Sequence, residues 1–150
     1  MPIRRNGSWK PLLGKSISKK HTKPKPVIRI DTNYIIRYFV NDDTVMADKA
    51  EAILQNENVF IANEIIAEVI YVLNGVYGID RDMIADLLLE LTSFENLLLS
   101  DRSVIKRSLE IYKAKKLDYV DCLLCAYSEQ DTIVTFDKKL NKCIKNIRES

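Results

Sequence analysis

The sequence has few of the residues from which disulfide scaffolds and zinc sites are built. Among 150 residues there are three cysteines (Cys122, Cys125 and Cys143) and a single histidine, His21. An odd number of cysteines gives no disulfide framework, so we expect free thiols in a reducing compartment. Four zinc ligands are hard to assemble from this set. Cys122 and Cys125 lie in an apolar, helix-like stretch, where we expect them to be buried as small hydrophobic residues.

Long apolar runs are also missing. No stretch approaches the roughly 20 residues that span a bilayer, and the first 26 residues lack the apolar core of a signal peptide. We therefore expect no membrane association and a cytoplasmic location. A transit peptide has a similar acid-free, basic composition, but three Lys-Pro pairs and the lack of an amphipathic period argue against one.

Acidic residues are absent from residues 1–26, which hold eight Lys or Arg and all four prolines. The remaining residues, 27–150, carry 15 basic and all 21 acidic residues, a net charge of −6. We predict a flexible basic arm over 1–26 and one folded domain over 27–150. The arm is either a solvated extension or an electrostatic contact for nucleic acid or membrane.

The body alternates short β-branched runs with longer segments of helical periodicity. Predicted strands are 27–30, 59–61, 96–100 and 132–136. Predicted helices are 33–40, 44–55, 64–76, 80–91, 102–115, 116–127 and a brief one through Leu140. This alternation predicts an α/β fold of three layers, α/β/α, with a central, mostly parallel sheet. Right-handed crossovers then place the ends of the parallel strands on one edge of the sheet.

Acidic residues recur where ligands bind in such folds. Asp31 and Asp137 each follow a predicted strand, and Asp118 and Asp121 lie in the first turn of a predicted helix. Helix capping alone also accounts for Asp31 and, at least as well, for Asp118. Glu68 lies in an apolar helix, where a buried charge needs a partner. Because crowded carboxylates repel, these acids suit a divalent cation such as Mg²⁺ or Mn²⁺, which prefers oxygen ligands.

Four stretches together resemble PIN domains, and specifically the VapC-type toxins of toxin–antitoxin pairs. They are Ile30-Asp31-Thr32-Asn33 with its following helix, Ala67-Glu68-Val69, Asp118-Tyr119-Val120-Asp121-Cys122, and Val134-Thr135-Phe136-Asp137. Their order covers nearly all of residues 27–150. The basic arm and a Cys after the second Asp of the third stretch depart from the usual pattern.

The resemblance implies a Mg²⁺- or Mn²⁺-dependent endoribonuclease that hydrolyses RNA phosphodiester bonds without a protein nucleophile. It implies metal-site acids at Asp31, Glu68, Asp121 and Asp137, and auxiliary candidates at Asp118, Thr32, Thr135 and Asn33. It also implies a homodimer and a cognate antitoxin whose peptide, with an Arg, occupies the acidic cleft.

Two rival functions remain open on the sequence alone. Asp31 could form an aspartyl phosphate in a phosphoryl-transfer enzyme, although Asp31-Thr32-Asn33 lacks the second Asp two residues on that haloacid-dehalogenase-like phosphatases use. Alternatively, the chain could be a non-catalytic PIN-like module that binds RNA. A nuclease assay with and without metal separates these possibilities.

Overall fold

The computed structural model describes residues 25–150, so the predicted arm lies outside the described residues except for Lys25 and Pro26. Within that range the elements are β1 (Ile28–Arg29), α1 (Thr32–Phe39), α2 (Thr44–Asn56), β2 (Val59–Ile61), α3 (Asn63–Gly75), α4 (Arg81–Leu91), β3 (Leu97–Leu99), α5 (Arg102–Ala114), α6 (Tyr119–Tyr127) and α7 (Lys138–Glu149). The predicted α/β class is confirmed. The three parallel strands lie in the order β1-β2-β3, and each is followed by a helix.

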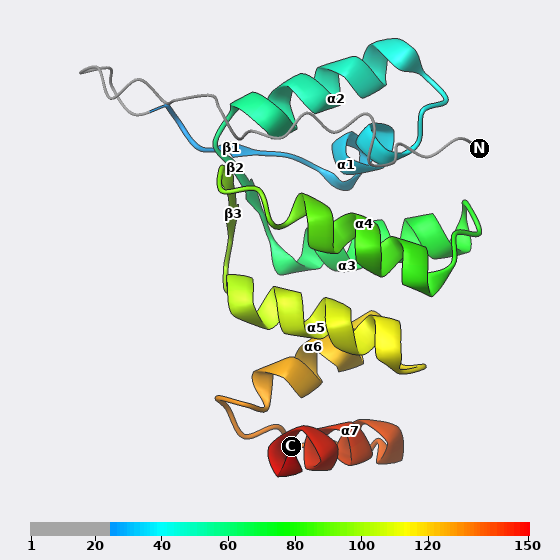
Figure 1. Ribbon diagram of the computed structural model, residues 1–150, viewed down its shortest axis with the longest axis vertical. Coiled ribbons are helices and arrows are strands. Elements are labelled where there is room, and N and C mark those ends of the chain that lie inside the picture. The colour runs from blue at the N-terminus through cyan, green and yellow to red at the C-terminus, as the bar shows by residue number, and fades with distance from the viewer. Residues whose placement is uncertain (1–24) are drawn as a thin grey trace.

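The helices are stacked along the longest axis of the molecule (Figure 1). Helices α1 and α2 lie at one end, α3 and α4 come next, then α5 and α6, and α7 lies at the other end. A single cluster of buried apolar side chains runs from Ile30 to Ile147 through all of these layers. Burial of the apolar face of each helix therefore holds the stack together.

The register of the sheet is fixed by its central strand. Val59 pairs with Ile28 on one side and with Leu97 on the other, so the carboxyl ends of all three strands reach the same edge. Val59 and Leu97 are fully buried. This edge is where Asp31 leaves β1 and begins α1.

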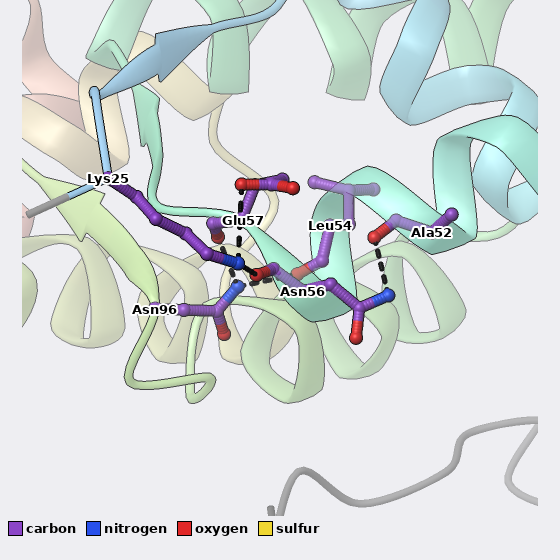
Figure 2. A network of polar contacts seen from close by, with 6 residues as sticks. All are labelled: Lys25, Ala52, Leu54, Asn56, Glu57 and Asn96. Carbon is purple, nitrogen blue, oxygen red and sulfur yellow. Dashed lines mark hydrogen bonds and ion pairs between the residues drawn. The ribbon is translucent and has the colours of Figure 1, made fainter. Parts of the chain in front are cut away.

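A network of polar contacts joins the opposite edge of the sheet to the end of α2 (Figure 2). The Asn96 amide Nδ2 donates to the carbonyls of Leu54 at 2.8 Å and Glu57 at 2.7 Å. Lys25 Nζ donates to the Asn56 carbonyl at 3.2 Å and lies 3.7 Å from Glu57 Oε2. Lys25, which the sequence assigns to the arm, therefore contacts the folded body.

The strand predicted over residues 132–136 is wrong. These residues run without ladder pairing, and Val134 and Phe136 are 90% and 104% exposed. Strand formation needs a neighbouring edge to supply hydrogen-bond partners. Here the following helix, α7, packs on α6, at the end of the molecule far from β1 (Figure 1). The brief helix predicted through Leu140 is in fact the 12-residue α7.

The prediction of free thiols at Cys125 and Cys143 is also wrong, because these two residues form a disulfide. The bond joins α6 to α7, and both cysteines are buried. Only Cys122 is a free cysteine among the described residues, and it is buried as predicted. Cysteine usage therefore no longer supports a reducing compartment. No helix within residues 25–150 combines the length and apolar character needed to cross a membrane.

Candidate active site

Asp31 lies where β1 passes into α1, and its carboxylate caps that helix. Asp31 Oδ1 accepts a hydrogen bond from the Tyr34 backbone N–H at 3.2 Å. The capping role expected of an Asp at such a junction is therefore present. The cap uses one oxygen, and the residue is exposed, so the carboxylate is open to a ligand as well.

Glu68 on α3 is connected to the start of α1 through Thr32, the residue after Asp31. The buried hydroxyl of Thr32 donates to Glu68 Oε2 at 2.7 Å, which joins residues 36 apart in the chain. Asp31, Thr32, Asn33 and Glu68 line one cavity of about 370 Å³. Its other walls are the apolar side chains of Ile36, Ile65, Val72 and Val76, together with Tyr77. The structure thus brings four of the predicted site residues together.

Asp121, on α6, belongs to a second group of acids together with Asp118 and Asp137. Burial raises the pKa of its half-buried carboxyl above the ordinary value, and the negative charges of Asp137 and Asp118 raise it further. Asp118 occupies the N-cap position of α6 but makes no side-chain cap hydrogen bond. Its negative charge is one of the causes that raise the pKa of the Asp121 carboxyl.

Helix α6 is held in place by its buried face. The Tyr119 hydroxyl and Ser108 Oγ of α5 lie 2.8 Å apart in a buried hydrogen bond, and the Tyr119 ring packs edge-on against Tyr112. The disulfide at Cys125 fixes the far end of the helix to α7. These contacts fix the position of α6, whose first turn carries Asp121.

Asp137 caps α7. Its Oδ1 accepts from the Leu140 backbone N–H at 2.8 Å, and its own backbone N–H donates to Thr135 Oγ1 at 3.0 Å. The Thr135 carbonyl accepts from the Asn141 amide at 3.0 Å. Thr135, a predicted auxiliary residue, therefore orients the turn that presents Asp137.

The structure places the predicted acids in two groups rather than one. Asp31 begins α1 and Asp137 begins α7, and these helices lie at opposite ends of the stack (Figure 1). Within residues 25–150, no three His, Cys, Asp or Glu side chains gather closely enough to hold a metal ion. Asp31 and Glu68 share one cavity, and Asp121 is affected by the charges of Asp137 and Asp118.

Asn63 was missed by the sequence analysis. It follows β2 at the same sheet edge as Asp31, and its Nδ2 donates to the Tyr127 hydroxyl of α6 at 3.0 Å. Its Oδ1 is buried and has no hydrogen-bond partner within the described part of the chain. The signal was its position directly after a strand, which the search for acids passed over.

Comparison with protein families identifies the architecture. The family model described as the PIN domain matches residues 28–145, which include both acid groups. The chain belongs to the PIN domain family. PIN domains are generally nucleases, which agrees with carboxylate groups near the sheet edge and at the start of α6. No curated protein and no solved structure matched the chain.

Proposed function

We propose that this PIN domain is an endoribonuclease of the VapC toxin type that requires Mg²⁺ or Mn²⁺. The observation that carries the proposal is that Asp31 and Glu68 line one cavity, where the Thr32 hydroxyl donates to Glu68 Oε2 at 2.7 Å. The negative charges of Asp137 and Asp118 also raise the pKa of the Asp121 carboxyl, after the larger effect of burial. Carboxylates held together in this way are stabilised by a cation. An enzyme that cleaves a phosphodiester with a bound metal ion also needs carboxylates gathered around that ion.

The donor set fits a hard cation. All of the candidate ligands are carboxylate oxygens, and Mg²⁺ commonly binds one or two carboxylates and completes its shell with water and substrate phosphate. Asp121 and Asp137 would hold the ion, and Asp31 and Glu68 supply the second pair of acids. When bound, the ion supplies Lewis acidity, which activates water and neutralises charge on the phosphate.

The chain's own groups hold these acids in position. The Thr32 hydroxyl fixes the orientation of the Glu68 carboxylate through a 2.7 Å hydrogen bond. The caps on α1 and α7 each use Oδ1, so among the described residues these bonds leave Oδ2 of Asp31 and Asp137 to face a ligand. A local hydrogen bond thus holds one carboxylate oxygen of Glu68, Asp31 and Asp137, and the other oxygen of each remains available.

RNA cleavage tests the proposal. Purified protein is incubated with single-stranded RNA in Mg²⁺, Mn²⁺ or EDTA, and products are resolved by gel. We expect cleavage only with metal, and a loss of about 100-fold or more for Asp121→Asn, because a charged group at the reacting centre is removed. Asp131→Asn, at an exposed acid in the turn after α6, is the matched control. Cleavage by Asp121→Asn at the rate of this control would refute the assignment.

A non-catalytic RNA-binding module is the second candidate. It is favoured by the lack of three metal-binding side chains in one place among residues 25–150. It predicts RNA binding with no cleavage in either metal. The cytoplasmic location, the homodimer and the antitoxin peptide with an Arg are parts of the VapC-type proposal. Co-expression with the protein encoded beside it, followed by purification of a complex, tests the last of these.

A further inference from the structure

A small cavity lies between α1 and α2, next to the Asp31 cavity. Its volume is about 210 Å³, and its walls are Asn33, Tyr34, Arg37, Met46 and Lys49. Tyr34 and Met46 are large apolar side chains that remain 38% and 46% exposed. The cavity therefore combines an aromatic ring and a thioether with two cations.

Arg37 lines this cavity and has one side-chain donor without an acceptor. Its NH1 donates to Asp42 Oδ1 at 2.8 Å, which fixes the guanidinium. Its Nε is buried, and no residue of the described chain accepts its hydrogen. A buried donor without an acceptor is unfavourable, so a small shift of the side chain that lets a ligand supply an acceptor is favoured.

Lys49 supplies positive charge at the same place. It is exposed on α2 and forms no ion pair with another residue between 25 and 150. The Asp31 cavity, in contrast, is lined by two acids and no cation. An RNA that enters the acidic cavity is repelled there, so its binding energy must come from neighbouring surface.

The two cavities are neighbours. Asn33 lines both, and the Tyr34 backbone N–H donates to Asp31 Oδ1 at 3.2 Å. A chain with a phosphodiester near Asp31 therefore places its adjoining nucleotide at Tyr34.

We propose that this cavity binds one nucleotide of the RNA substrate, with the base stacked on Tyr34 and a base acceptor on the Arg37 guanidinium. Lys49 contacts the adjoining phosphate. The proposal rests on the proposed ribonuclease function and assigns it a base-binding subsite. Aromatic rings beside cations are how proteins bind single-stranded RNA, and guanidinium groups recognise the edges of unstacked bases.

The test measures binding of a fluorescent single-stranded hexaribonucleotide by anisotropy, in EDTA, with the RNA checked for integrity afterwards. Tyr34→Ala should weaken binding about 5- to 100-fold, the loss expected for one stacked base. Tyr34→Phe, which keeps the ring, should bind like the parent. Tyr71→Ala, at another exposed tyrosine on α3, is the matched control.

Two further arms identify the contacts. The parent should bind a hexamer with one abasic position more weakly than the intact hexamer. The Tyr34→Ala variant, which has no ring for the base to stack on, should bind the two hexamers equally. Lys49→Gln should reduce the slope of log affinity against log salt by about 0.7, the value for one phosphate contact on a single strand. Lys145→Gln, at an exposed lysine on α7, should leave the slope unchanged.

The outcomes separate this proposal from the proposed function. If the parent cleaves RNA with metal but Tyr34→Ala binds as tightly as Tyr71→Ala, the base subsite is overturned and the ribonuclease stands. The cavity would then be free to bind a peptide instead. If the parent binds RNA with the predicted Tyr34 and abasic effects but does not cleave it, the subsite stands and the ribonuclease fails. If the parent neither binds nor cleaves, both are overturned.

Discussion

The Thr32 hydroxyl donates to Glu68 Oε2 at 2.7 Å, and this bond connects the beginning of α1 to the middle of α3. Thr32 itself is buried, whereas Glu68 is exposed to the cavity that Asp31 also lines. The hydroxyl therefore controls which way the carboxylate points.

Replacing Thr32 by Val tests this control. The side-chain shape is kept and the donor is lost, so we expect a cost of about 1 kcal/mol in the free energy of unfolding. Metal-dependent cleavage should fall about 10- to 100-fold, as when groups that orient metal ligands are removed. Thr32→Ser should restore most of the activity. Full activity in a folded Thr32→Val protein would show that the bond has no functional role.

Asp101 provides a pH-dependent contribution to stability. Hydrogen bonds from the Val104 backbone N–H and then the Ser103 hydroxyl lower the pKa of its carboxyl below the ordinary value of 3.8. A lowered pKa in the folded state gives stability that is present above 3.8 and is lost as the pH falls through the folded value.

Asp101→Asn should therefore flatten the loss of stability below about pH 4, because the group no longer titrates. Urea unfolding between pH 2 and pH 7 measures this. Asp131→Asn serves as the control for simple removal of an acid. If the stability of Asp101→Asn falls as steeply below pH 4 as that of the parent, the lowered pKa of Asp101 is contradicted.

The Cys125–Cys143 disulfide closes a loop between two residues that are 18 positions apart in the sequence. Constraining a loop of this size stabilises the folded state by about 3 kcal/mol. Reductant should lower the unfolding midpoint of the parent but not that of a variant with both residues changed to Ala. Mass spectrometry of the denatured protein after alkylation should find one modified thiol, Cys122. Three modified thiols without reductant would show that the bond is absent.

Phe136 is fully exposed in a segment that has no strand partner. Phe136→Ser should change the free energy of unfolding by no more than about 0.5 kcal/mol, as is usual for surface positions. The amides of residues 133 and 134 should exchange rapidly with solvent. A large loss of stability, or strong amide protection, would mean that the segment pairs with a sheet edge after all.

Local patterns predicted most of the elements between residues 28 and 127, because helical and strand periodicity are properties of neighbouring residues. They also identified Asp31, since an acid directly after a strand is visible in the chain. The run Thr132–Phe136 has strand composition, but a strand also needs a free edge beside it. That depends on where α7 packs, which no local pattern records.

The same reason explains the disulfide and the two groups of acids. Cys125 and Cys143 meet because α6 and α7 lie together, and the sequence alone gave no sign of that packing. Order along the chain led to the four predicted metal-site acids but not to which of them are neighbours. The burial of Arg37 Nε without a hydrogen-bond partner also depends on how the helices pack, so the sequence did not indicate it.

The most direct test of the account is RNA cleavage by Asp31→Asn, compared with the parent, in Mn²⁺ and in EDTA. The substitution keeps the shape of the α1 cap and removes one negative charge from the cavity that also holds Glu68. We predict metal-dependent cleavage by the parent and a loss of about 100-fold or more in a variant with an unchanged unfolding midpoint. Cleavage by folded Asp31→Asn at the parental rate would contradict the account.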